Sequence, residues 1–192
     1  MAKVLVLYGT REGQTRRIAT RIAEVIRARG HSVVLLDAKE AGANLNVRSF
    51  QAACVGAPIH RNSYPRAVVR FARDHRGWLQ AAPSAFFSVG LAIVSRTHDG
   101  RAESQSCVDR FARKTGWTPA RVAFMAGALP YSKYGALVRW VMRRAAKRAG
   151  GDTDVSRDYE YTDWALVEQF ASEFADAITS RGASTEHSTA AE

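Results

Sequence analysis

The sequence predicts an α/β fold in which a parallel sheet lies between two layers of helices. Short apolar runs that are typical of buried strands alternate with longer segments in which apolar residues recur at helical spacing. The start of the chain shows this pattern: the run Val4–Leu7 precedes a polar turn and then a helix-like segment with apolar residues between Ile18 and Ile26. A chain of 192 residues is long enough for one such domain with a substantial core.

The strands are expected in runs rich in valine, leucine, alanine and phenylalanine, at residues 3–8, 32–36, 52–57, 84–91 and 121–126. Proline marks several of their ends: Pro58 follows the third strand, Pro83 precedes the fourth, and Pro119 precedes the fifth. Because helices separate the strands, we expect the strands to pair in parallel.

The helices are expected at about 13–29, 64–75 and 102–114, with a last helix after Asp163. Gly30 is well placed to end the first helix, and Asp163 to cap the last. Residues 38–49 are a polar connection with at most a short helix. Residues 180–192 are small and polar, which predicts a disordered tail after a single domain of residues 1–179.

The turn from Tyr8 to Thr15 is the most informative local feature of the chain. It follows a strand and opens a helix, so its backbone N–H groups and the positive end of the helix dipole suit a phosphate. It has no lysine and is therefore not the loop that binds nucleoside triphosphates. The hydroxyls of Thr10 and Thr15 suit a phosphate monoester instead. The alternative is a turn with a threonine cap and no ligand.

The same turn resembles the FMN loop of flavodoxins, whose pattern is matched by Tyr8, Thr10, Gly13, Thr15 and Ala19. This resemblance implies a flavodoxin-like three-layer fold with a five-stranded parallel sheet in the order 2-1-3-4-5. In that fold the ligand lies at the carboxyl ends of the strands, where three loops converge. The residues expected to bind FMN are Thr10, Arg11, Glu12, Gly13, Gln14, Thr15, Pro58, Ile59, His60, Ser88, Val89, Gly90 and Leu91.

A long insert, at about residues 130–162, separates the fifth strand from the last helix, where a plain connection needs only a few residues. Residues 133–149 predict a helix with one apolar arc and, opposite it, a basic arc of Arg139, Arg143, Arg144 and Lys147. A basic amphipathic helix can lie on an anionic membrane. The alternative is a helix that packs its apolar arc on the domain and leaves its arginines in water.

Other matching pieces extend over nearly the whole chain. The glycine-rich piece at 150–154 and the piece Tyr161–Trp164 are not general features of flavodoxins. With the turn at 10–15, they make the chain resemble the menaquinone-dependent protoporphyrinogen dehydrogenases, flavodoxin-like enzymes of bacterial haem biosynthesis. The resemblance implies an oxidoreductase and flavoprotein that oxidises protoporphyrinogen IX to protoporphyrin IX, with FMN as cofactor and a quinone as electron acceptor.

The net charge of +10 favours an anionic partner such as a membrane surface or a carboxylate substrate, although a solvated basic surface is an equal alternative. No nucleic acid is expected, because no known binding module appears. No apolar stretch is long enough to span a membrane, and no signal peptide is visible. We therefore expect a cytoplasmic protein, peripheral on the inner face of the cell membrane.

Few further residues suggest specific chemistry. No metal is expected, because no cluster of ligand residues has suitable spacing, and Cys54 is expected to be a buried small hydrophobe. The loops after the third and fourth strands are expected to lie beside the flavin ring. Their arginines could hold the propionates of a porphyrinogen, or could simply be solvated. These are Arg61, Arg96 and Arg101. His60 and His98 could relay protons, but no catalytic base is assigned.

Two other functions remain open at this point. An electron-carrier flavodoxin would bind the same cofactor without being an enzyme, but such proteins are usually acidic and need no amphipathic insert. An NAD(P)H:quinone reductase would also use FMN, and rapid flavin reduction by NAD(P)H would favour it. The sequence does not predict an oligomeric state.

Overall fold

The computed structural model describes residues 1–42, 45–95, 99–129, 131, 144 and 154–189. Its centre is a parallel sheet made of β1 (Lys3–Tyr8), β2 (Ser32–Asp37), β3 (Ala52–Pro58), β4 (Ser84–Gly90) and β5 (Arg121–Ala126). The strands pair in the order β2-β1-β3-β4-β5, which confirms the predicted sheet.

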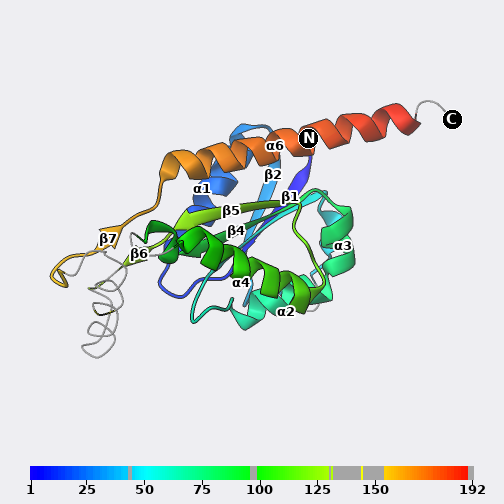
Figure 1. Ribbon diagram of the computed structural model, residues 1–192. Helices are drawn as coiled ribbons and strands as arrows, with labels where there is room; N and C mark the ends of the chain where they lie inside the picture. Colours follow the sequence, from blue (N-terminus) through cyan, green and yellow to red (C-terminus); the bar gives the residue numbers. More distant parts are fainter. Residues whose placement is uncertain (43–44, 96–98, 130, 132–143, 145–153, 190–192) are drawn as a thin grey trace.

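Helices cover both faces of this sheet (Figure 1). One layer consists of α1 (Gln14–Ala28) and α6 (Trp164–Thr189). The opposite layer consists of α2 (Arg66–Asp74), α3 (Arg76–Ala81) and α4 (Gly100–Thr115). The predicted three-layer fold is therefore confirmed. Short 3-10 helices, η1 (Val47–Ser49) and η2 (Ala92–Val94), lie in two of the connections.

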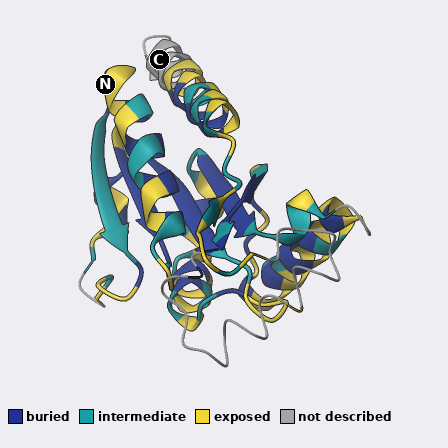
Figure 2. Ribbon diagram, turned by 90° about the vertical axis from the view of Figure 1, so that its left-hand side faces the viewer, coloured by how far each residue is buried: buried dark blue, intermediate teal, exposed yellow. Residues whose placement is uncertain are grey.

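The inner strands β1, β3 and β4 are buried on both faces, because each helical layer packs an apolar stripe against them, whereas the edge strand β2 is half-buried. The core on the α1–α6 side includes Ile18, Ile22 and Phe174, and the core on the other side includes Phe86 and Phe111. Figure 2 shows the buried strands between helices whose outer faces are exposed. Strands that are buried on both faces leave only their ends for a ligand site.

The predicted helix at about 64–75 is confirmed as α2, and a second short helix, α3, follows it without having been predicted. The backbone leaves helical geometry at His75, where φ is −113° and ψ is 19°, and Gly77 lowers the helix propensity of the second segment. The polar connection at 38–49 contains only the short η1, in line with the expectation of at most a short helix.

A small antiparallel sheet of β6 (Ala128–Leu129) and β7 (Tyr159–Glu160) extends beyond the carboxyl end of β5. The sequence did not predict it, because strands of two residues show no detectable alternation. The insert predicted at about 130–162 starts at the end of β6. The helix predicted at 133–149 lies outside the described residues apart from Arg144, so its two arcs stay predictions.

The helix α6 starts where the sequence placed it. Asp163 caps it, since the backbone N–H of Leu166 donates to the Asp163 carboxylate over 3.1 Å. The backbone stays helical through Thr189, beyond residue 179, where a disordered tail was expected to begin. The sequence after Ser180 contains no proline that would break the helix. The domain limits 1–179 remain a prediction.

Candidate functional site

The candidate site lies at the carboxyl edge of the sheet, where backbone hydrogen bonds connect the predicted segments. The loop after β3 is tied to the end of β4, because Ile59 N–H donates to the carbonyl of Val89 over 2.7 Å. The end of β4 is tied to the residue after β5 by the bond from Gly127 N–H to the carbonyl of Gly90, 3.3 Å long. The turn at 9–15 follows β1, which lies between β2 and β3 in the sheet, and Gly9 N–H donates to the carbonyl of Gly56 in β3 over 2.8 Å. The structure thus brings the three predicted segments to one edge.

The turn after β1 is closed by its own threonine. The hydroxyl of Thr10 accepts a hydrogen bond of 3.0 Å from Gly13 N–H. Gly13 has φ +99°, which a residue with a side chain rarely adopts. A Cβ atom at Gly13 would meet nothing within 4 Å, so backbone conformation rather than lack of space favours glycine there. The Thr10 hydroxyl keeps its own proton available for a ligand.

The first turn of α1 presents backbone N–H groups to this turn. The first helical hydrogen bond runs from Arg17 N–H to the carbonyl of Gly13, so the N–H groups of Gln14, Thr15 and Arg16 have no helical partner. No side chain caps this end of α1, and its first turn carries no acidic residue. Such an end, with its positive dipole, favours an anion.

Thr15 is the residue that most clearly indicates a ligand. Its side chain is only 2% exposed, and its hydroxyl forms no hydrogen bond with any residue that the structure describes. A buried polar group without a partner costs about 1–3 kcal/mol and is uncommon in native proteins. A phosphate bound at the first turn of α1 would accept from this hydroxyl as well as from the backbone. The residues present therefore fit the phosphate of a flavin mononucleotide.

The loop after β3 forms a tight two-residue turn. His60 N–H donates to the carbonyl of Ser63 over 2.8 Å, and Ser63 N–H donates back over 3.1 Å. Between them, Arg61 and Asn62 have φ of +49° and +56°. Left-handed backbone at residues other than glycine is uncommon and gathers at functional sites. Pro58, Ile59 and His60 lie on the sheet side of this turn, where the sequence placed flavin contacts.

Two of the predicted contact residues point into the protein. The Ser88 hydroxyl is 1% exposed and lies 2.8 Å from the Tyr64 hydroxyl, with which it shares a hydrogen bond. Burial raises the pKa of Tyr64 above its ordinary range. Val89 is also buried. A ligand at this edge can therefore meet Ser88 and Val89 only through backbone atoms, whereas the half-buried Gly90 and Leu91 are accessible.

Arg11 and His60 connect the turn at 9–15 to the loop after β3, here called the ring-side loop. The Arg11 guanidinium donates to Nε2 of His60 over 2.7 Å. Burial first, and then the charges of Arg11 and Arg61, lower the pKa of His60 below its ordinary 6.5. His60 is therefore neutral at pH 7, with Nε2 as the acceptor and its proton on Nδ1.

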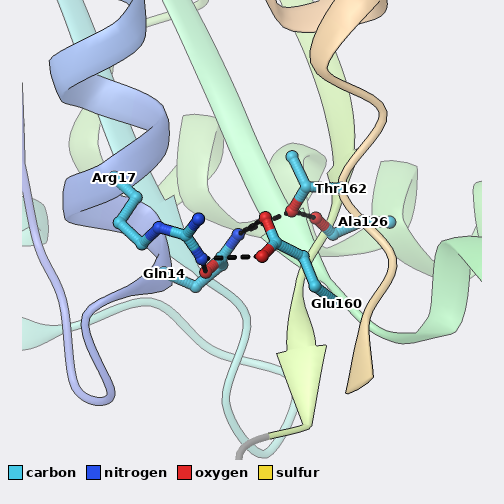
Figure 3. Close-up of polar contacts among 5 residues, drawn as sticks. All are labelled: Gln14, Arg17, Ala126, Glu160 and Thr162. Carbon is cyan, nitrogen blue, oxygen red and sulfur yellow. Dashed lines mark hydrogen bonds and ion pairs between the residues drawn. The ribbon is translucent and has the colours of Figure 1, made fainter. Parts of the chain in front are cut away.

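The side chain of Gln14 is bound to the last residues of the insert rather than to the turn (Figure 3). Its amide donates to the Glu160 carboxylate over 3.0 Å and to the Thr162 hydroxyl over 2.8 Å. Thr162 in turn donates to the carbonyl of Ala126 over 2.9 Å. Arg17 completes the group with a 2.7 Å ion pair to Glu160. These five residues, here called the Gln14 cluster, leave only the backbone N–H of Gln14 for a cofactor.

The carboxylate of this cluster is ionised at neutral pH. Burial alone would raise the pKa of Glu160, but hydrogen bonds from Arg17 and Gln14 outweigh it and lower the pKa below its ordinary 4.5. Sequence reasoning did not single out Glu160 or Arg17. The piece Tyr161–Trp164, which follows Glu160 directly, was the available signal.

Apolar side chains next to the cluster form a third core at this edge. Tyr131 is fully buried and Leu129 is 4% exposed, and the predicted contact residue Leu91 packs against them. The rings of Tyr159 and Tyr161 are parallel, with centroids 6.2 Å apart. The insert therefore supplies an aromatic wall beside the candidate site, which the sequence did not predict.

The other candidates are only partly placed. Arg61 is exposed, and the Arg101 guanidinium lies 5.5 Å from the centre of the Phe124 ring. Arg96 and His98 lie outside the described residues. Cys54 is buried as predicted, and burial raises the pKa of its thiol.

Comparison with known proteins places the chain among flavodoxin-like proteins. A family model described as a flavodoxin domain matches residues 5–156. Among solved structures, Flavodoxin 1 from Bacillus cereus superposes with a TM-score of 0.56 at 14% identity, covering 91% of this chain and 97% of the other. This likeness shows the fold alone.

Relatives with higher identity carry a more specific name. The chain is 33% identical over 174 residues to the protoporphyrinogen IX dehydrogenase (quinone) of Escherichia coli, covering 90% of this chain and 94% of that protein. It is 32% identical over 177 residues to the protein of the same name from Leishmania major, covering 90% of this chain and 74% of that one.

Proposed function

Because this chain belongs to the flavodoxin family and to its protoporphyrinogen IX dehydrogenase branch, we propose that it oxidises protoporphyrinogen IX to protoporphyrin IX in haem biosynthesis. FMN is the proposed cofactor and a quinone the electron acceptor. The observation that carries the reaction is the extent of the match to the relatives. It covers 90% of the chain and so must include most of the segment between β5 and α6.

The phosphate of FMN has a suitable place at the first turn of α1. The N–H groups of Gln14, Thr15 and Arg16 would hold it, with the hydroxyls of Thr10 and Thr15. The residues Arg11 to Gly13, Pro58 to His60 and Ser88 to Leu91 would surround the rest of the cofactor. When bound, FMN supplies the ability to accept electrons from the porphyrinogen and to pass them to the quinone.

The protein's own side chains bind and orient. Arg61 and Arg101 are exposed near the ring-side loops and suit the propionate carboxylates of the substrate, which arginine can hold with two parallel hydrogen bonds. Neutral His60 holds its proton on Nδ1, and its Nε2 accepts a hydrogen bond from the Arg11 guanidinium. The aromatic wall of Tyr159 and Tyr161 excludes water from one side of the site.

A location on the inner face of a bacterial cell membrane fits this reaction, with the rest of the protein in the cytoplasm. A quinone with an apolar tail dissolves in lipid, and a net charge of +10 attracts the protein to anionic lipid headgroups. No described helix has the length and hydropathy to cross a bilayer.

The reductive half of the reaction tests the proposal. FMN-loaded protein would be mixed anaerobically with protoporphyrinogen IX or with NADPH, and bleaching of the flavin colour followed. We expect protoporphyrinogen IX to bleach the flavin quickly and NADPH slowly. Fast bleaching by NADPH alone would assign the protein as an NAD(P)H:quinone reductase instead. A flavin that neither donor reduces would favour an electron carrier.

A further inference from the structure

The positive charge of the protein is concentrated in one of its two helical layers. Residues 60–116, which contain α2, α3 and α4, carry ten Lys and Arg against four Asp and Glu. Residues 14–29 and 164–189, which contain α1 and α6, carry six against five. Without Arg96, which lies outside the described residues, the first stretch still carries a net charge of +5, against +1 for the second.

Three arginines of the α1–α6 layer form ion pairs within that layer or with the adjoining β7. Arg21 on α1 pairs with Glu168 on α6 over 2.7 Å, and Arg29, which follows α1, pairs with Asp176 on α6. Arg17 pairs with Glu160. This layer presents little unbalanced charge to solvent.

The opposite layer has a stripe of exposed arginines that form no ion pair with another helix among the described residues. Arg66, Arg70 and Arg73 are spaced four and three residues apart on α2, so they lie on one side of the helix, and all three are exposed. Arg73 pairs with its neighbour Asp74 over 3.3 Å. Arg66 and Arg70 have no carboxylate partner among the described residues. Arg76 on α3 and Arg113 and Lys114 on α4 extend this basic face.

A groove between α2 and α4 combines this charge with apolar surface. It has a volume of about 190 Å³ and is lined by Val69 and Phe111 together with Arg110 and Lys114. Arg110 also donates to the carbonyl of Asn62 over 3.2 Å, in the tight turn of the ring-side loop. The basic face is therefore continuous with the candidate site.

We propose that the outer face of α2, α3 and α4 is a docking surface for an anionic lipid bilayer. Charges spread over an exposed helical face suit a charged membrane surface, and a groove with an apolar floor and a cationic wall suits a phospholipid headgroup at the interface. The inference rests on the proposed function in one respect, since a lipid-soluble quinone can be reached only at a bilayer. Docking by this face holds the ring-side loop close to the membrane.

The other classes of anionic partner fit this face less well. Binding of single-stranded nucleic acid relies on exposed aromatic rings that stack on bases, whereas Phe71, Phe111 and Trp117 are buried in the core of this layer. The centre of a protein interface is poor in charged residues, whereas the exposed side of α2 carries Arg66, Arg70 and Arg73.

Vesicle binding of the FMN-loaded protein tests the docking surface. Vesicles would contain phosphatidylcholine alone or equal parts of phosphatidylcholine and phosphatidylglycerol, at low salt. The variant Arg66→Gln/Arg70→Gln/Arg73→Gln is here called the α2 variant. It should bind the anionic vesicles at least about tenfold more weakly than wild type, because each basic residue near such a surface contributes roughly a fivefold increase in affinity. Neither protein should bind the neutral vesicles.

The matched control removes three arginines from the other layer. Arg16→Gln/Arg27→Gln/Arg29→Gln changes the net charge equally and should bind almost as wild type does. An equal loss of vesicle affinity in both variants would mean that net charge alone determines binding. Wild-type affinity in the α2 variant would mean that another surface binds the membrane. Either result overturns the proposal. So would wild type that ignores anionic vesicles, or that binds single-stranded RNA through these arginines instead.

Activity separates this proposal from the proposed function. The α2 variant should oxidise protoporphyrinogen IX at the wild-type rate with a short-chain, water-soluble quinone, since its three arginines lie outside the candidate site. Absence of this activity in wild type would remove the proposed function, while the vesicle measurement would still decide the docking surface.

Discussion

The side-chain amide of Gln14 donates a 2.8 Å hydrogen bond to the hydroxyl of Thr162, which lies 148 residues further along the chain. Gln14 is the first residue of α1, and Thr162 lies between β7 and α6. Thr162 passes the connection on to the carbonyl of Ala126 at the end of β5. The Thr162 hydroxyl therefore joins three parts of the protein. They are the proposed phosphate site, the end of β5 and the segment that leads into α6.

Replacing Thr162 with valine removes both of these hydrogen bonds while keeping the shape of the side chain. We expect a loss of about 1–3 kcal/mol in the free energy of unfolding, since each bond contributes about 0.5–1.5 kcal/mol. Urea unfolding measures this loss. Thr20→Val is the control, because among the described residues the Thr20 hydroxyl bonds only to the carbonyl of Arg16 in its own helix. An equal effect of the two substitutions would contradict a special role for Thr162.

Replacing Thr15 with valine should separate cofactor binding from stability. The Thr15 hydroxyl has no partner among the described residues, so its loss should leave the cofactor-free protein as stable as wild type, or more stable. FMN affinity should fall by about ten- to a hundredfold, because a hydrogen bond to a charged group contributes about 1.5–3 kcal/mol.

Fluorescence titration with FMN measures the affinity, and thermal unfolding of the cofactor-free protein measures the stability. Thr15→Ser, which keeps the hydroxyl, should retain most of the affinity. Unchanged affinity in the double variant Thr10→Val/Thr15→Val would place the phosphate elsewhere.

The histidine of the ring-side loop should titrate below its ordinary pKa of 6.5. A lowered pKa means that the unfolded chain binds the proton more tightly than the folded chain. The stability linked to His60 is therefore complete above pH 6.5 and is lost as the pH falls through the lowered folded value. NMR titration of the ring should show this low pKa, and Arg11→Gln should move it part of the way back up. A wild-type value at or above 6.5 would contradict the Arg11–His60 arrangement.

The sequence was sufficient for the sheet and for the local structure of the turn after β1, because both depend on local patterns. Continuous apolar runs mark strands buried on both faces, such as β3 and β4. The turn from Thr10 to Thr15 is closed by a hydrogen bond between residues close in sequence, since the Thr10 hydroxyl accepts from the N–H of Gly13.

The parts that sequence reasoning missed depend on contacts between distant residues. Gln14 was expected to contact the cofactor because of its position in the turn, but its side chain is held by Glu160 and Thr162 from the far end of the chain. The inward direction of Ser88 is set by its bond to Tyr64. In a sheet that is buried on both faces, apolar and polar residues do not alternate along a strand. The sequence therefore does not show toward which face a side chain such as that of Ser88 points.

The central claim is most directly tested by complete turnover. Purified FMN-loaded protein would be mixed anaerobically with protoporphyrinogen IX and a menaquinone analogue, and the fluorescence of protoporphyrin IX followed with time. We expect a porphyrin signal that rises in proportion to enzyme and quinone and that falls strongly in Thr10→Val/Thr15→Val at limiting FMN. A rate no higher than that of the protein-free control would contradict it.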